Sequence, residues 1–320
     1  MPRFVLHVGY PKTGTTFLQQ SVFAQLDAVL NLGRPLDMYN ADTLGLRRGI
    51  LVDPAPDLDA IAETMRTDVR QRAADGDRRV AVLSDEHFST AALTSTMATQ
   101  PPETVFARLR ATFPDARVLF VLRRQADLVR SQHTNELRVA RTRRGLAAWL
   151  AEERARADGG VFRAFDFERT AEVAASHFGA DRLHVLLYED LVHAPDRFAH
   201  DLAAALDVPP DLVKPYIAST PLNRSSGLED VYLTLRRWVP PAALRAGPLR
   251  HLRRGAILPR VRRIAARLPV MGAARRLDPA VEAEIQHHFA PGNTRLAVRF
   301  GLPLAAYGYP VESQHRGSVT

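Results

Sequence analysis

A loop of glycine, lysine and threonine residues follows the first apolar run of the chain. Residues 4–8 are mostly apolar and β-favouring, Gly9 ends the run, and residues 17–26 place apolar side chains at helical spacing. In a strand–loop–helix turn of this kind, backbone N–H groups and the positive end of the helix dipole converge where an anion binds. The loop therefore has the composition of a phosphate cradle, with threonine hydroxyls as additional donors.

The position of the lysine distinguishes this loop from the nucleotide-binding P-loop. Gly9 and Gly14 have the spacing of the pattern G-x-x-x-x-G-K-[ST], but Thr15 occupies the lysine position and Lys12 lies three residues earlier. Magnesium–nucleotide chemistry needs the lysine beside the Ser or Thr that holds the metal. The displaced lysine therefore predicts a phosphate donor that is handled without magnesium. A plain Gly/Pro turn that binds no ligand is the alternative.

A second pair of polar residues lies beyond another apolar run. Arg123 directly follows the run 118–122, and Ser131 lies eight residues later, about two turns into a predicted helix. A guanidinium and a hydroxyl placed in this way can clamp a second phosphate, and each charge-assisted contact contributes about 1.5–3 kcal/mol. Taken alone, the two residues also fit an ordinary solvated surface. Together with the first loop, they predict a ligand with two anionic ends.

Both patterns are similar to those of one enzyme family. The loop Tyr10-Pro11-Lys12-Thr13-Gly14-Thr15-Thr16 resembles the 5′-phosphosulfate loop of sulfotransferases that use 3′-phosphoadenosine 5′-phosphosulfate (PAPS). Residues 121–131 are similar to the 3′-phosphate-binding segment of that family, with Arg123 and Ser131 on its two ligand positions. The resemblance, to bacterial members in particular, implies an α/β fold with a P-loop-NTPase-like central parallel β-sheet flanked by helices. It also implies direct in-line transfer of a sulfuryl group to an acceptor hydroxyl, with PAP as product and no metal.

The resemblance gives each residue of the expected donor site a role. Lys12 is expected to act catalytically, against the bridging oxygen where negative charge grows as the S–O bond breaks. Tyr188 is expected to pack near the nucleotide base, although a plain core position is an equal alternative. The loop 221–227 resembles one that reaches the 3′-phosphate in bacterial members, with Arg224 in place of the R-K-G motif of the cytosolic small-molecule enzymes. The expected PAPS-binding residues are Lys12, Thr13, Gly14, Thr15, Thr16, Arg123, Ser131, Tyr188 and Arg224.

A general base for the acceptor proton is expected after the apolar run 80–83. Sulfotransferases that act on small phenols and alcohols resemble one another in a His here, whereas several carbohydrate-directed ones use a Glu. Glu86 is therefore the first candidate and His87 the second, and Glu86 favours a carbohydrate or lipid-linked acceptor. Two alternatives remain: Asp85 and Glu86 only terminate the strand, or Asp85 holds magnesium in an NTPase.

The elements that must position these residues alternate between strand and helix patterns. Strands are expected at 4–8, 80–83, 118–122 and 183–188, and helices at 17–26, 58–75, 101–113, 126–139, 146–156, 168–178, 198–206 and 280–300. Such βαβ units predict a parallel sheet whose ligands bind at the carboxyl ends of the strands, just after residues 8, 83 and 122. Residues 27–57 have no clear period and are expected to form a long connection that lines a substrate mouth.

Composition sets broad limits on the class of protein. The chain has 320 residues, 46% hydrophobic and 24% charged, which is typical of a globular protein, and we expect one domain over 1–320. The absence of cysteine excludes disulfides and thiolate zinc sites, and the histidines show no metal-ligand spacing. We find no leader pattern and no apolar stretch near 18 residues, so a soluble, cytoplasmic protein is expected.

The net charge of +8 is concentrated in one segment. Residues 236–276 contain twelve Arg and no Asp or Glu, so the remainder carries +8 − 12 = −4. This segment is expected to form an Arg-rich helical lid or insertion: a solvated surface, a groove for an anionic acceptor, or an interfacial helix that contacts an anionic membrane surface. Nucleic acid is not an expected partner, because no HTH, RRM or zinc pattern is present.

Two rival functions are compatible with parts of the sequence. A P-loop kinase or NTPase would turn over ATP with magnesium and would need Thr15 to do the work of a lysine. A catalytically dead protein that binds a nucleotide or a polyanion would keep the phosphate cradle without turnover. Both remain open on the sequence alone.

Overall fold

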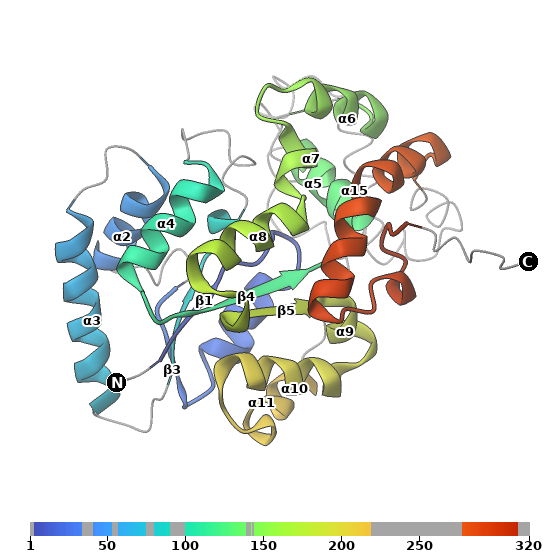
Figure 1. The fold of residues 1–320 in the computed structure, drawn as a ribbon. Helices are drawn as coiled ribbons and strands as arrows, with labels where there is room; N and C mark the ends of the chain where they lie inside the picture. The colour runs from blue at the N-terminus through green and yellow to red at the C-terminus, as the bar shows by residue number, and fades with distance from the viewer. Residues whose placement is uncertain are drawn as a thin grey trace, which may run out of the picture.

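A five-stranded parallel sheet forms the centre of the protein in a computed structural model (Figure 1). The structure describes residues 3–33, 41–52, 57–74, 80–89, 100–138, 142, 144–218 and 277–312. The strands are β1 (Arg3–His7), β2 (Val29–Asn31), β3 (Val80–Ser84), β4 (Arg117–Leu122) and β5 (Leu183–Leu187). Their order is β2-β3-β1-β4-β5, and every neighbouring pair is parallel. The α/β class and the parallel sheet predicted from the sequence are confirmed.

The strand register brings the expected ligand-binding ends together. His7, the last residue of β1, is level with Ser84 at the end of β3. On its other side, His7 is level with Leu119 of β4, which continues to Leu122. The loops that follow residues 8, 83 and 122 therefore leave the same edge of the sheet, because parallel strands share the direction of their carboxyl ends.

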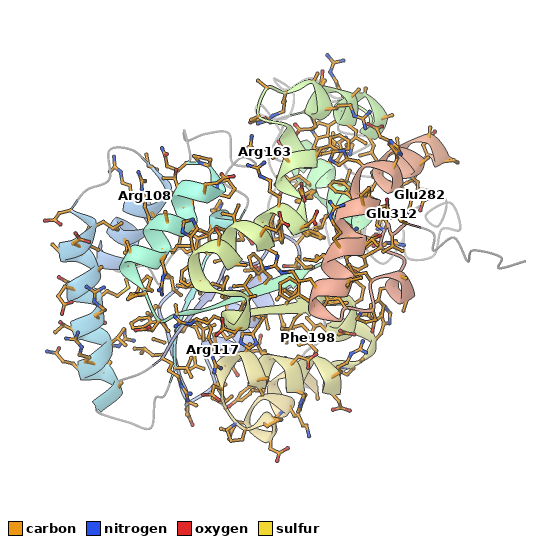
Figure 2. All side chains as sticks on the ribbon, in the orientation of Figure 1. Arg108, Arg117, Arg163, Phe198, Glu282 and Glu312 are labelled. Atoms are coloured by element: carbon orange, nitrogen blue, oxygen red, sulfur yellow. The ribbon has the colours of Figure 1, made fainter. Side chains whose placement is uncertain are left out.

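Helices cover both faces of the sheet (Figure 1). The larger hydrophobic core lies between one face and the helices α2 (Ala41–Leu51), α3 (Leu58–Ala74), α4 (Pro102–Thr112), α5 (Gln125–Arg138), α6 (Leu146–Ala155), α7 (Gly160–Ala164), α8 (Phe167–Phe178) and α15 (Pro279–Phe300). The second core lies between the opposite face and α9 (Tyr188–His193), α10 (Pro195–Leu206) and α11 (Pro210–Ala218). Phe198, for example, is fully buried between α10 and the sheet (Figure 2).

Side-chain alternation along β1 explains why its central residues, Phe4–Leu6, are all apolar. Val5 contributes to the second core, whereas Leu6 and Val8 contribute to the first. A parallel strand covered on both faces needs apolar residues in both alternating positions. The continuous apolar runs read from the sequence at β1, β3 and β4 have this origin.

The structure corrects three sequence expectations. Residues 27–57 are not a plain connection, because they contain the edge strand β2 and the helix α2. The fourth expected strand ends at Leu187, and Tyr188 begins α9 instead. The helix expected over 17–26 consists of the short α1 (Thr15–Phe17) and a wide π-helical turn, η1, over Leu18–Phe23. The edge strand was missed because three residues are too few to show a period.

The remaining expected helices are found within a few residues of their predicted positions. Among the described residues, no helix is long and apolar enough to cross a membrane. The Arg-rich segment 236–276 and Arg224 lie outside the described residues. Their predicted roles stay predictions.

Candidate functional site

The loop after β1 is shaped by two residues with left-handed backbone. Lys12 has φ 68° and Gly14 has φ 86°. The Thr13 hydroxyl donates to the Tyr10 carbonyl oxygen at 2.6 Å, and the Thr15 hydroxyl donates to the same oxygen at 3.2 Å. Both threonines are buried. Their hydroxyls therefore fix the curvature of the loop from within.

The remaining predicted ligand residues of the loop differ in exposure. Lys12 and Thr16 are exposed, whereas Gly14 precedes the first turn of α1 and its carbonyl accepts the Leu18 N–H at 3.0 Å. A Cβ on Gly14 would lie 3.3 Å from Leu191 and 3.6 Å from the Tyr188 ring. Gly14 therefore serves both the left-handed turn and the close approach of α9.

Arg123 contacts two of the other predicted donor-binding residues, Lys12 and Tyr188. Its Nη1 donates a hydrogen bond of 2.8 Å to the Lys12 carbonyl oxygen. Its guanidinium carbon lies 4.7 Å from the centre of the Tyr188 ring, within the range of a cation–π contact. The structure thus brings together the cradle, the residue after β4 and the first residue of α9.

A partly buried carboxylate that the sequence did not single out for the site supports the turn beside Arg123. Glu189 accepts the Arg124 backbone N–H at 3.0 Å and the Tyr309 hydroxyl at 2.7 Å. Burial raises the pKa of the Glu189 carboxyl. Because Tyr309 is 120 residues away in the chain, no local spacing could reveal this contact. The C-terminal segment thereby packs against the turn that presents Arg123.

Ser131 lies in the second turn of α5, where the sequence placed it, and it is partly buried. The N-terminal end of this helix is tied to α15 by a buried amide pair. Gln125 Nε2 donates to Asn293 Oδ1 at 2.8 Å, and Asn293 Nδ2 donates back to Gln125 Oε1 at 3.1 Å. A reciprocal amide pair leaves little rotational freedom, so it fixes the start of the helix that carries Ser131.

A cluster of charged side chains follows β3. Asp85 is 1% exposed and caps the short 3₁₀ turn Glu86–Phe88, accepting the His87 backbone N–H at 2.9 Å. His87 Nδ1 lies 2.6 Å from the same carboxylate oxygen, Oδ1. The other oxygen, Oδ2, is paired with Arg47 of α2. Glu86 and His87 are both half-buried.

This cluster is connected to the phosphate cradle by backbone contacts. The Asp85 N–H donates to the His7 carbonyl oxygen at 3.0 Å. The Ser89 hydroxyl lies 3.2 Å from the carbonyl oxygens of Gly9 and Glu86. The two catalytic candidates of the sequence, Glu86 and His87, are therefore held on a turn that is bonded directly to the loop after β1.

A buried histidine packs beneath the cradle. His7 Nδ1 lies 2.7 Å from the Ser84 hydroxyl, which also accepts a hydrogen bond of 2.9 Å from Gln19. Burial lowers the pKa of His7 to about 4, so its ring is neutral at neutral pH. A Cβ on Gly9 would lie 2.8 Å from His7 Nε2. The Gly9 position of the P-loop-like pattern is therefore also required by packing against this ring.

The Asp85 carboxyl gives a testable pH dependence of stability. Burial alone raises its pKa, but hydrogen bonds from His87 and the positive charges of His87 and Arg47 outweigh burial and lower the pKa to about 2. Because the pKa of Asp85 is lower in the folded than in the unfolded protein, the ionised carboxylate stabilises the fold at pH values above the unfolded pKa near 4. This stabilisation is lost as the pH falls toward 2. For such a shift the contribution is roughly 2–3 kcal/mol.

We therefore expect Asp85→Asn to be less stable than the parent protein by roughly 2–3 kcal/mol at pH 6, with the difference shrinking as pH falls below about 4. Urea unfolding of both proteins between pH 6 and pH 3 measures this difference. A difference that stays constant over the whole range would contradict the assigned ionisation.

The chain is similar to known proteins in sequence and in fold. The family model described as "Sulfotransferase family" matches residues 3–211. Among curated proteins, no significant match was found. The crystal structure of a sulfotransferase from Alicyclobacillus acidocaldarius superposes with a TM-score of 0.57 at 16% sequence identity, over 96% of this chain and 98% of that chain. That likeness establishes the P-loop-like α/β fold of sulfotransferases.

Two further solved domains are more distant. The sulfotransferase domain of the Synechococcus PCC 7002 olefin synthase has a TM-score of 0.38 at 13% identity, over 75% of this chain and 94% of that chain. The sulfotransferase domain from the curacin biosynthetic pathway has a TM-score of 0.38 at 16% identity, over 68% of this chain and 78% of that chain. Scores this low support no inference about the present chain.

Proposed function

The chain belongs to the sulfotransferase family, and from this premise we propose that it transfers a sulfuryl group from PAPS directly to an acceptor hydroxyl. The bond between sulfur and the bridging oxygen breaks, and its electron pair stays on the 5′-phosphate of PAP. A new bond forms between sulfur and the acceptor oxygen, whose proton passes to a base on the protein. The family implies PAPS as the co-substrate.

The observation that carries this proposal is the contact between the two predicted phosphate sites. Arg123, assigned to the 3′-phosphate, donates to the carbonyl of Lys12, assigned to the 5′-phosphosulfate. A donor with phosphates at the 3′ and 5′ positions of one adenosine needs two anion-binding sites that are close together, and this hydrogen bond joins the two segments that carry them. Lys12 and Thr16, on the exposed side of the loop, offer a cation and a hydroxyl to the donor.

Positioning and electrostatic stabilisation supply most of the rate in such a transfer. Holding donor and acceptor in line converts a bimolecular reaction into an effectively unimolecular one. Lys12 is the group proposed to neutralise charge on the bridging oxygen as the S–O bond lengthens. The base is drawn from the turn after β3, where Glu86 and His87 are the candidates.

Ligand-induced stabilisation tests the proposed donor. We expect PAP at 100 times its dissociation constant to stabilise the protein by about 2.7 kcal/mol, seen as a rise of several degrees in melting temperature. ATP with magnesium should give a smaller rise at equal concentration. A larger rise with ATP and magnesium would favour a kinase or NTPase, and a rise only with a heparin-like polymer would favour a polyanion-binding protein.

A panel of acceptors tests the second half of the proposal. Labelled PAPS is incubated with saccharides, lipid-linked alcohols and phenols, and transfer of label to each is measured. The resemblance associates a glutamate base with carbohydrate acceptors and a histidine base with small phenols and alcohols. Saccharides or lipid-linked alcohols are therefore the expected acceptors if Glu86 is the base, and phenols or small alcohols if His87 is.

A further inference from the structure

The ring of His87 is held in one orientation by a buried carboxylate. Asp85 Oδ1 contacts both the backbone N–H of His87, at 2.9 Å, and its ring nitrogen Nδ1, at 2.6 Å. The Asp85 side chain is 2% exposed and the His87 side chain 16% exposed. Two contacts to one oxygen restrict both the backbone turn and the ring rotation of His87.

This contact also selects the tautomer of the ring. The pKa of Asp85 is about 2, so its carboxyl is ionised at neutral pH and can only accept hydrogen bonds. The proton of a neutral His87 ring must therefore reside on Nδ1, next to the carboxylate. Its second nitrogen, Nε2, then carries the lone pair that a base needs.

Arg47 fixes the carboxylate from the other side. It pairs with Asp85 Oδ2, which leaves Oδ1 for His87. The helix that carries Arg47 is itself anchored by Arg108 of α4, whose position is marked in Figure 2. Arg108 donates to the carbonyl oxygens of residues 49, 50 and 52, at 3.1 to 3.3 Å, at the C-terminal end of α2. Among the residues that the structure describes, the charged groups of this cluster are Asp85 and Glu86 from the turn of His87 and Arg47 from α2.

We propose that His87 takes the acceptor proton at Nε2, and that Asp85, held by Arg47, is the positioning residue that sets the tautomer of His87 and stabilises its charged form. This inference rests on the proposed sulfotransferase function. The proton leaves the acceptor oxygen as that oxygen bonds to sulfur, and the resulting imidazolium keeps its Nδ1–H bond to Asp85. The imidazolium of His87 later releases this proton from Nε2 to solvent.

The assignment places His87 ahead of Glu86 as the base. Side chains of adjacent residues on a 3₁₀ turn diverge by about 120°, so Glu86 and His87 do not face the same point. Of the two, His87 has its ring oriented by a buried, ionised partner. The reason for favouring a carbohydrate acceptor over a phenol, which depended on Glu86, is correspondingly removed.

The tautomer provides a test that needs no acceptor. In protein labelled with nitrogen-15 in histidine, the ring signals of His87 are assigned by their loss in His87→Gln. We expect a protonated Nδ1 and a bare Nε2 in the neutral ring, and a shift toward the other tautomer in Asp85→Asn. A bare Nδ1 in the parent protein, or no change in Asp85→Asn, would overturn the proposal.

The rate of sulfuryl transfer provides the second test. Release of labelled sulfate from PAPS, with water in place of the acceptor, is followed under single-turnover conditions. His87→Gln should lower this rate roughly 10²- to 10⁴-fold. Asp85→Asn should lower the transfer rate by about 10-fold to about 10⁴-fold. The lower limit is the usual effect of losing a hydrogen-bonding partner that supports a functional side chain. The upper limit is the effect of removing the charge of the buried aspartate from a Ser-His-Asp triad.

Glu153→Gln is the matched control for loss of a buried carboxylate. Glu153 of α6 is also nearly buried, accepts the Val161 N–H at 3.1 Å and pairs with Arg156 at 3.3 Å. The Glu153→Gln variant should have a lower free energy of unfolding, with an unchanged His87 tautomer and an unchanged transfer rate. PAP binding is measured in every variant by calorimetry.

The outcomes separate the two proposals. No PAP binding by the parent protein would remove the proposed function, while the tautomer still reports on the pair of Asp85 and His87. PAP binding with an unchanged rate in His87→Gln would remove the inference alone. A loss of rate in Glu86→Gln that His87→Gln does not share would assign the base to Glu86.

Discussion

Replacing Lys12 with alanine is expected to lower the rate of sulfuryl transfer by about 10²- to 10³-fold, the usual effect of removing one group that stabilises transition-state charge. PAP affinity should change only a few-fold, because the charge on the bridging oxygen develops mainly in the transition state. Alanine keeps a Cβ at this position, so the cost of the left-handed backbone, φ 68°, is similar for both residues. The single-turnover rate with labelled PAPS and the dissociation constant of PAP measure the two effects.

The chain supplies a matched control for the loss of a lysine charge. Lys214 is the second of only two lysines and pairs with Asp211 at the surface of α11. Lys214→Ala should leave transfer unchanged. If Lys12→Ala instead weakens PAP binding and leaves the rate at saturating donor intact, Lys12 is a ground-state ligand and its assigned role is wrong.

Replacing Arg123 with alanine is expected to produce the opposite pattern. Loss of one charge-assisted phosphate contact, worth about 1.5–3 kcal/mol, weakens PAP binding by roughly 10- to 150-fold. The variant also loses the hydrogen bond to the Lys12 carbonyl and the contact with the Tyr188 ring, so part of the effect comes from the shape of the cradle. Calorimetric titration with PAP measures the affinity.

A comparison of ligands separates the direct contact from the indirect one. Adenosine 5′-phosphosulfate lacks the 3′-phosphate, so Arg123→Ala should weaken its binding much less than that of PAPS. Arg130→Ala removes a nearby arginine that pairs with Asp127 on α5 and should leave PAP affinity within a few-fold. Equal losses for the two donors would show that Arg123 acts only through the loop.

The local patterns of the sequence predicted the central sheet because their physical cause is local. Continuous apolar runs at β1, β3 and β4 indicate strands covered on both faces, and βαβ connections of these lengths require parallel neighbours. The edge strand β2, only three residues long, and the helix α2, whose apolar period is weak, gave no comparable signal.

The phosphate cradle was also predictable from sequence, because its residues are consecutive and their types are dictated by backbone geometry. Gly14 provides the left-handed residue, and the threonines provide short hydroxyls that reach the Tyr10 carbonyl. Arg123 could be placed near this loop since it follows a parallel strand. Its contact with the Lys12 carbonyl shows that the adjacent strand ends meet as expected.

The amino-acid sequence by itself determined four of the five strands, the position of the loop and the choice of candidate ligands, all of which depend on neighbours within a few residues. Only the tertiary structure decided how side chains from distant segments pair. Asp85 meets Arg47 from a segment whose sequence showed no clear structure, and Glu189 meets Tyr309 from the C-terminal region. Buried charges must find partners wherever the fold brings them, and sequence spacing carries no record of those partners.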